Sequence, residues 1–412
     1  MAEIPVSPFA PARFPALPAV AGVAAATAAA GVRYKGREDV LLTTLPRGST
    51  VAGTFTRNTM PGAPVDWSRR HVAQGKARAL VVNTGNANVF TGKAGAKAVR
   101  DTAEAAAKLL GCRPAEVFVA STGVIGEPLP AERILAVLGD LARAQAPADW
   151  QRVANAIRTT DTFAKGAGRI ARIGQREVAI AGVAKGSGMI QPDMATMLAF
   201  VFTDARLPAD VLRGLLRPAV DDSFNAITVD SDTSTSDTVL LFATGQVPLP
   251  RAIARAGDPL LRDFRAKLLE VCQELAQQIV RDGEGAQKFV EIRVGGAASK
   301  AAARRIGLAV ANSPLVKTAI AGADANWGRV VMAVGKSGEK ADRDRLSIRM
   351  GGVTIAERGY PHPDYREEQV RPHMRGREIL IEVDVGIGTG SATVWTCDLT
   401  HGYISINGDY RS

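Results

Sequence analysis

Short apolar runs that lead into glycine-containing polar loops recur through the first half of the chain. They lie at residues 79–88 (ALVVNTGNAN), 117–126 (VFVASTGVIG) and 177–188 (EVAIAGVAKGSG). Runs of this length that are rich in valine and bounded by glycine are typical of buried strands. Each segment is therefore predicted to be a strand that ends in a polar loop.

Helical segments separate these strands, and further strands follow near the end of the chain. Alanine-rich residues 93–110 predict a helix that ends at Gly111, because glycine is favoured just past a helix C-terminus. Further helices are predicted at 131–146, 149–159, 207–220 and 259–281. The last third is predicted to be mostly strands, at 346–356, 378–388, 391–399 and 401–410. This mixture indicates an α+β protein and argues against a single doubly wound parallel sheet.

One segment raises a chemical question. Residues 185–202 (KGSGMIQPDMATMLAFVF) pass from a glycine-rich stretch into an apolar run in which Thr196 supplies a single hydroxyl. A strand covered on both faces accommodates threonine, which has a good strand propensity. The alternative is that Thr196 is a nucleophile held where a flexible loop enters the core. The pattern alone leaves both readings open.

The composition is that of an ordinary globular protein. The 412 residues are 46% hydrophobic and 22% charged, a length that suits about two or three domains. No apolar run reaches the length of about 18 residues that predicts a membrane span. Residues 20–30 are apolar, but Glu3 and several prolines precede them in place of a basic leader. We therefore expect these residues to belong to the folded protein, and we expect a cytoplasmic protein without a membrane partner.

Charge and metal-binding residues argue against other classes. The net charge is +10, yet the basic residues are spread along the chain and the aromatic fraction is only 5%, which does not favour a nucleic-acid partner. Cys112, Cys272 and Cys397 lie far apart without a CxxC pair. The four histidines lack metal-ligand spacing. We expect a reducing compartment, no disulfide framework, no metal and no resident cofactor.

Three motifs come close to a ligand-binding pattern. Residues 330–338 (VVMAVGKSG) have Val330 where a P-loop needs glycine. Residues 386–391 (GIGTGS) have Ser391 where a dinucleotide fingerprint needs its third glycine. Residues 229–238 (VDSDTSTSDT) are rich in carboxylates and hydroxyls but lack EF-hand spacing, so a hydrogen-bonded loop is favoured over a cation site.

A threonine nucleophile needs a base within reach. If the peptide bond before Thr196 is broken, the threonine gains its own α-amine, whose ordinary pKa of about 7.7 to 8.0 is close to working pH. The Thr196 hydroxyl could make this cut by attacking the carbonyl of Ala195. Gly186 and Gly188 upstream would permit the strained backbone that the attack needs. An oxyanion would also need donors, and residues 120–126 (ASTGVIG) offer the Thr122 hydroxyl beside the Gly123 amide.

Six ordered motifs together resemble one known family. They are KGSGMIQPDMATMLAF, ASTGVIGEPLP, NTGNANVFTG, TVDSDTSTSDT, GADANWGR and the ending YISINGDYRS. The chain is similar to the ornithine acetyltransferases, the bifunctional glutamate N-acetyltransferases of arginine biosynthesis, from the N-terminal FPALPAVAGV to the last residue. This resemblance favours the nucleophile over the satisfied threonine.

The resemblance implies a fold and a processing step. The expected fold is a layered α/β/β/α sandwich of the self-cleaving aminopeptidase and ornithine acetyltransferase kind, with a smaller strand-rich C-terminal α/β domain. Cleavage between Ala195 and Thr196 would give an α chain, residues 1–195, and a β chain, residues 196–412. Residues 196–285 would complete the catalytic sandwich and residues 286–412 would form the smaller domain. A heterotetramer of two α and two β chains is expected.

The resemblance also implies the reaction and its residues. Thr196 would carry an acetyl group from N-acetylornithine to glutamate, with Thr122 and Gly123 as the oxyanion hole. Whether acetyl-CoA is a second donor is left open. The substrate contacts carried over from the family fall on Thr162, Lys185, Thr196, Glu284, Asn407 and Ser412.

Two positions depart from the family pattern. In residues 228–238 we expect glycine at Ser231 and asparagine at Ser236, so the geometry of this loop is the least certain part of the resemblance. The nearest alternative function is a self-cleaving aminopeptidase or amidase of the same superfamily, in which water takes the place of the amine acceptor.

Overall fold

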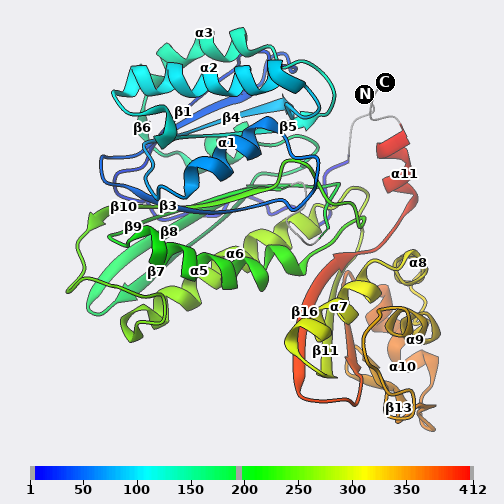
Figure 1. The fold of residues 1–412 in the computed structure, drawn as a ribbon. Coiled ribbons are helices and arrows are strands. Elements are labelled where there is room, and N and C mark those ends of the chain that lie inside the picture. The colour runs from blue at the N-terminus through cyan, green and yellow to red at the C-terminus, as the bar shows by residue number, and fades with distance from the viewer. Residues whose placement is uncertain (1–4, 192–196, 409–412) are drawn as a thin grey trace. The chain divides into compact units, whose positions relative to one another are not determined.

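The structure, a computed structural model, describes residues 5–191 and 197–408 (Figure 1). The chain divides into two compact units. We call residues 11–225 and 232–279 the sandwich unit, and residues 1–10, 226–231 and 280–412 the C-terminal unit. Within the described ranges, no helix is long and apolar enough to cross a membrane.

Two five-stranded sheets form the described part of the sandwich unit. The first has the order β5-β4-β2-β1-β6. Its strands are β1 (Ala24–Ala28), β2 (Val40–Thr44), β4 (Ala79–Asn86), β5 (Val117–Val124) and β6 (Ala146–Pro147). The second has the order β3-β10-β9-β8-β7. Its strands are β3 (Thr50–Phe55), β7 (Lys165–Ile173), β8 (Arg176–Lys185), β9 (Leu198–Ala205) and β10 (Thr238–Val247).

Helices cover the outer faces of both sheets (Figure 1). Helices α2 (Gly92–Leu110) and α3 (Ala131–Arg143) cover the first sheet, and α5 (Ala209–Asp221) and α6 (Arg262–Arg281) cover the second. Helices α1 (Ala63–Val72) and α4 (Trp150–Ala156) complete this unit, and short 3₁₀ turns lie at Pro114–Glu116, Phe224–Ala226 and Pro259–Leu261. The predicted α/β/β/α sandwich is therefore confirmed.

The core between the two sheets is aromatic and aliphatic. Phe118 of the first sheet meets Phe242 of the second edge-on, with ring centroids 6.0 Å apart. Phe202 stacks on Phe242 at 5.2 Å. These side chains are almost fully buried. Burial of large aromatic surface is a major stabilising term in such a core, so the two sheets form a rigid base for the strand ends that carry the site.

The C-terminal unit is built on a six-stranded sheet in the described residues. Its order is β14-β13-β12-β15-β11-β16. The strands are β11 (Phe289–Ala297), β12 (Ser347–Met350), β13 (Val353–Glu357), β14 (Tyr360–Pro361), β15 (Glu378–Asp384) and β16 (Gly390–Cys397). The helices are α7 (Lys300–Ala311), α8 (Pro314–Ala321), α9 (Trp327–Gly335), α10 (Glu367–Arg375) and α11 (His401–Gly408).

Most predicted elements are confirmed. Helix α2 ends as expected at Gly111, which adopts a left-handed φ of 61°. The other four predicted helices correspond to α3, α4, α5 and α6, and Asp149 caps α4 by accepting a hydrogen bond from the amide of Arg152. The apolar run at the end of residues 185–202 contains the start of strand β9, which begins at Leu198.

The strand predicted at residues 401–410 is wrong, because residues 401–408 form helix α11. The alternating apolar and polar residues suggested a strand. Contacts at helical spacing decide otherwise: Ser405 donates to the carbonyl of His401, and Asn407 donates to that of Tyr403 at 3.1 Å. Thr400 starts the helix by accepting a hydrogen bond from the amide of Gly402.

Candidate active site

Two predicted site residues meet at the strand ends of the sandwich unit. Thr122 lies near the end of β5, and Lys185 is the last residue of β8. Lys185 Nζ donates a hydrogen bond to Thr122 Oγ1 at 3.4 Å. Both residues are buried, with exposures of 1% and 2%. Since β5 and β8 belong to different sheets, the contact joins the two layers of the sandwich.

Gly123 occupies a place that only glycine can fill. Its φ is 135°, and an added Cβ would lie 2.3 Å from the carbonyl carbon of Gly85. The two glycines pair across β4 and β5. This close approach fixes the backbone beside Thr122, which suits a residue predicted to offer an amide to an oxyanion.

A buried carboxylate, missed in the sequence, organises the lysine side of the site. Asp161 Oδ1 accepts hydrogen bonds from Lys165 Nζ at 2.6 Å and from the Gly186 amide at 2.7 Å. Burial alone would raise the pKa of the Asp161 carboxyl, but the ammonium groups of Lys165 and Lys185 hold it well below its ordinary value. Asp161 is therefore ionised and fixes the backbone that follows Lys185.

Thr162 lies beside this carboxylate in the sequence and is half-buried in the loop before β7. The motif TTDTFAKG contains both residues. Nothing local in this motif shows that the aspartate is buried; in the structure its carboxylate needs a cation, and Lys165 supplies one.

A second buried carboxylate contacts the chain next to the predicted nucleophile. Asp237 is fully buried, and its Oδ1 accepts a hydrogen bond from the Met197 amide at 2.9 Å. Burial raises the pKa of Asp237 well above its ordinary value, although the Met197 amide and the charge of Lys185 oppose this shift. The predicted hydrogen-bonded loop at 229–238 is confirmed: Thr56 donates to the Ser234 carbonyl and Asn58 to the Thr233 carbonyl.

Two other predicted site residues meet in the C-terminal unit. Asn407 Nδ2 donates a hydrogen bond to Glu284 Oε2 at 2.8 Å. Glu284 is 7% exposed and lies in the turn between α6 and β11. Helix α11 packs closely on this turn, because an added Cβ at Gly285 would lie 2.4 Å from the Tyr403 amide nitrogen. Ala195, Thr196 and Ser412 lie outside the described residues.

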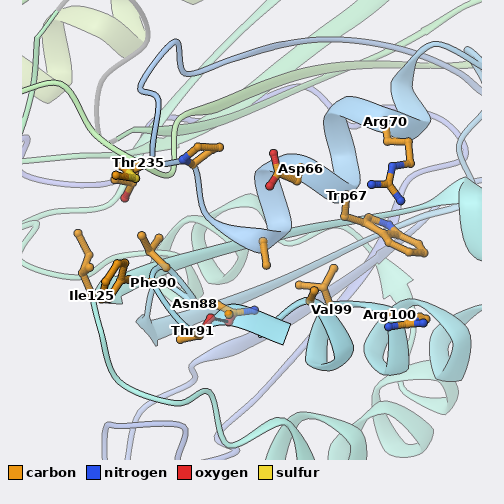
Figure 2. A pocket seen from close by; sticks show the side chains of 16 residues that line it. Asp66, Trp67, Arg70, Asn88, Phe90, Thr91, Val99, Arg100, Ile125 and Thr235 are labelled. Atoms are coloured by element: carbon orange, nitrogen blue, oxygen red, sulfur yellow. Dashed lines mark hydrogen bonds between the residues drawn. The ribbon is translucent and has the colours of Figure 1, made fainter. Parts of the chain in front are cut away.

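A hollow of about 650 Å³ lies between α1 and α2 of the sandwich unit (Figure 2). Trp67, Arg70 and Arg100 line one part of it, and Ile125 and Thr235 line another. Thr122, Gly123, Thr162 and Lys185 are not among its lining residues. The hollow is thus distinct from the Thr122–Lys185 contact, although Ile125 follows the oxyanion residues closely along β5 and its loop.

The described ranges contain no ready set of metal ligands. No three histidine, cysteine, aspartate or glutamate side chains there gather in a way that could hold an ion. The three cysteines are unpaired by disulfides, and burial raises the pKa of the Cys272 thiol to about 12.

Comparisons with known proteins identify the family of the chain. Residues 24–412 match the family model described as "ArgJ family". The chain is 56% identical to the arginine biosynthesis bifunctional protein ArgJ of Brucella suis and 57% identical to that of Rhizobium meliloti, in each case over 99% of both chains. A crystal structure of the Bacillus halodurans ArgJ protein is 38% identical, with a TM-score of 0.49, over 51% of this chain and 98% of that one. The resemblance seen in the motifs is confirmed, and the chain belongs to the ArgJ family.

Proposed function

We propose that this protein transfers the acetyl group of N2-acetyl-L-ornithine to L-glutamate through an acetyl ester on Thr196. The step belongs to arginine biosynthesis, which is the process named for the relatives. Self-cleavage between Ala195 and Thr196 frees the α-amine that serves as the base. The donor leaves as ornithine, and glutamate then attacks the ester to give N-acetylglutamate.

The observation that carries this proposal is the contact between Lys185 and Thr122 at 3.4 Å. Because the ammonium can only donate, it engages a lone pair of the Thr122 oxygen and leaves the hydroxyl hydrogen available for another acceptor. A hydroxyl oriented in this way suits an oxyanion hole completed by the Gly123 amide. The same ammonium is placed to attract a carboxylate.

The charge of the buried cluster supports the choice of substrates. Lys165 and Lys185 both act on the ionised Asp161, and burial raises the pKa of Asp237 well above its ordinary value. A buried ammonium group favours an anionic group beside it. N-acetylornithine and glutamate both carry an α-carboxylate, so Lys185 suits the part that donor and acceptor share.

The remaining substrate residues suit the side chain of ornithine. Glu284 and the terminal carboxylate of Ser412 are proposed to hold its ammonium group, with Asn407 orienting Glu284 through their 2.8 Å hydrogen bond. Thr162 is proposed to contact the substrate beside Asp161. Water must be kept away from the acetyl ester, since hydrolysis would turn the transferase into a deacetylase.

The mature enzyme is proposed to be a cytoplasmic heterotetramer of two α chains, residues 1–195, and two β chains, residues 196–412. No resident cofactor is needed, because the acetyl group passes through Thr196 alone. Acetyl-CoA is proposed as a second acetyl donor, which would let the same pocket make N-acetylglutamate directly. Both donors would form the same acetyl ester.

Intact-mass spectrometry tests the proposal directly. The purified protein should consist of fragments 1–195 and 196–412, and N-acetylornithine alone should add one acetyl group to the second fragment. The Thr196→Ala protein should remain one chain without an adduct. An active wild-type protein that stays uncleaved, or that forms no adduct under rapid quench, would contradict the mechanism.

A second assay separates transfer from hydrolysis. Acetate release from N-acetylornithine should be slow without glutamate, and N-acetylglutamate should form when glutamate is added. Equal acetate release with and without glutamate would instead identify an amidase. Initial rates should give the parallel double-reciprocal lines of a ping-pong reaction.

A further inference from the structure

The backbone amide and the backbone carbonyl of Met197 are both hydrogen-bonded, each to one of two consecutive residues of another segment. The Met197 amide donates to Asp237 Oδ1 at 2.9 Å, and the Met197 carbonyl accepts a hydrogen bond from the Thr238 amide at 3.1 Å. Met197 is itself 1% exposed. Since Met197 directly follows Thr196 in the sequence, these two hydrogen bonds fix the described residue nearest to the proposed nucleophile.

The segment that holds Met197 is itself firmly attached to β3. The amide of Thr56 donates to the Asp237 carbonyl at 3.1 Å, and the amide of Gly62 donates to the Thr235 carbonyl at 2.9 Å. Thr238 then enters β10, where it pairs with Phe55 of β3. The Asp237 side chain therefore projects from a rigid base rather than from a free loop.

The second carboxyl oxygen of Asp237 has an unusual environment. Oδ2 is buried and accepts no hydrogen bond from any described residue. An ionised carboxylate with one oxygen left unpaired in the core would be strongly disfavoured. In the neutral form this oxygen is a hydroxyl, which can donate a hydrogen bond. Burial raises the pKa of this carboxyl, and the Met197 amide, the charge of Lys185 and the Thr56 side chain, which act to lower it, do not outweigh burial.

We propose that Asp237, as a neutral carboxyl, is a positioning residue for Thr196: it clamps the Met197 amide so that the threonine is held in line for attack. This role rests on the proposed function, in which Thr196 is the nucleophile. It applies both to self-cleavage and to acetyl transfer, because both reactions start from the same side chain.

The neutral form makes a specific prediction about two substitutions. Asparagine keeps an oxygen acceptor for the Met197 amide and is uncharged, so Asp237→Asn should cleave itself and transfer acetyl groups at close to the wild-type rate. Asp237→Ala removes the clamp. A misplaced nucleophile can cost about 10²-fold in rate, and we expect a loss of this order in self-cleavage and in kcat, with little change in KM.

Asp204 provides a matched control on the strand that begins after Met197. It is 7% exposed, and its Oδ1 accepts a hydrogen bond from the Ala179 amide at 2.9 Å, much as Asp237 does from Met197. It lies near the far end of β9 (Leu198–Ala205). Asp204→Ala should therefore lower the melting temperature and leave the rate of self-cleavage unchanged.

The experiment measures the rate of self-cleavage of freshly made precursor by gel, and then kcat and KM of the cleaved protein for N-acetylornithine and glutamate. If the wild type cleaves itself and Asp237→Ala cleaves as rapidly, the positioning role of Asp237 is overturned, while the proposed function stands. An Asp237→Asn protein as slow as Asp237→Ala would show that the ionised carboxylate is needed and would also overturn it. If Asp204→Ala slows self-cleavage as much as Asp237→Ala does, the effect is general destabilisation and the positioning role is overturned. A wild-type protein that never cleaves would contradict the proposed function itself.

Discussion

Asn407 and Glu284 lie 123 residues apart in the sequence and are joined by a hydrogen bond of 2.8 Å from the side-chain amide to the carboxyl. The other hydrogen of this amide points along helix α11 to the carbonyl of Tyr403 at 3.1 Å. Asn407 thus uses both donors, one to complete the helix and one to hold Glu284. Asparagine suits this position in helix α11 because its side-chain amide has two hydrogens, one for each of these acceptors.

The Asn407–Glu284 hydrogen bond predicts a change in substrate binding. In Asn407→Leu, the carboxylate of Glu284 loses a charge-assisted donor and its fixed orientation. Such bonds contribute about 1.5 kcal/mol or more, so the KM for N-acetylornithine should rise about tenfold while self-cleavage proceeds normally. Ser405→Ala is the control on the same helix, since Ser405 bonds only to the His401 carbonyl. An unchanged KM in Asn407→Leu would remove Glu284 and Asn407 from the substrate site.

Thr122 and its partner across the sheet offer a second test. Thr122 pairs in register with Thr84 of β4, and both are buried. The Thr84 hydroxyl has no hydrogen-bond partner among the described residues, whereas Thr122 is bound to Lys185. Valine has the same shape as threonine without the hydroxyl. Thr122→Val should lower kcat by about 10²- to 10³-fold, the usual cost of one oxyanion donor.

Thr84→Val provides the matched control for this loss. It removes an unpaired buried hydroxyl, so kcat should be unchanged and the melting temperature should stay the same or rise. The measurement is the steady-state rate with saturating N-acetylornithine and glutamate. Equal activity in the two valine proteins would show that the Thr122 hydroxyl contributes nothing to the transition state.

The raised pKa of Asp237 predicts a pH dependence of stability. A carboxyl whose pKa is higher in the folded state binds its proton more tightly there, so its stabilising contribution is present below about pH 4, the ordinary value, and is lost as the pH rises through the folded pKa. In the single-chain Thr196→Ala background, the protein that retains Asp237 should lose unfolding free energy as the pH rises above about 4. Adding Asp237→Asn should flatten this decline.

The pKa of Asp161 is shifted in the opposite direction to that of Asp237, so Asp161 does not interfere with this measurement. Its pKa is lowered in the folded state by Lys165 and Lys185, so its contribution is present at neutral pH and is lost only on acidification below about pH 4. Chemical denaturation at each pH, with and without Asp237→Asn, separates the two windows. Parallel curves above about pH 4 would show that the pKa of Asp237 is not raised in the folded protein.

The strand pattern predicted an α+β protein because its strands are apolar and bounded by glycine, and the resemblance to a known family implied the layered sandwich. It also brought Thr122 and Lys185 forward, but only as parts of ordered motifs, since neither residue is distinctive by itself. Asp161 and Asp237 could not be recognised in the same way. Both are charged residues in polar stretches, where exposure is the ordinary expectation, and their burial depends on strands that lie far away in the sequence, such as β3 and β8.

The end of the chain shows a different limit. Residues 401–410 alternate between apolar and polar side chains, which is the period of a strand. Helix α11 forms because Thr400 caps its first turn and because Thr400 also donates to the Gly285 carbonyl at 2.7 Å, which fixes where the helix starts. That tertiary contact has no local signature in the sequence.

Ser231 is the position at which this chain departs from the glycine expected for the family, and its backbone shows the consequence. It adopts a left-handed φ of 66° while carrying a side chain. Such a conformation costs about 1–2 kcal/mol for a residue with a Cβ, and glycine avoids this cost while losing roughly 0.5–1 kcal/mol through its greater freedom in the unfolded chain. Ser231→Gly should therefore raise the unfolding free energy by up to about 1 kcal/mol.

Ser391 is the matched control, because it is an exposed serine in strand β16 and is not among the residues of positive φ in the described chain. Ser391→Gly has no strain to relieve, so it should lower the unfolding free energy by about 0.5–1 kcal/mol. Urea denaturation of both variants in the Thr196→Ala background gives the comparison on a single chain. The amide of Ser231 bonds to Thr228 Oγ1 at 3.3 Å, and this contact survives in glycine. The exposed hydrogen bond from Ser231 Oγ to the Asp230 carbonyl at 2.5 Å is lost in glycine, which reduces the expected gain. If Ser231→Gly is destabilised as much as Ser391→Gly, the left-handed serine is not strained and the departure from the family pattern carries no cost.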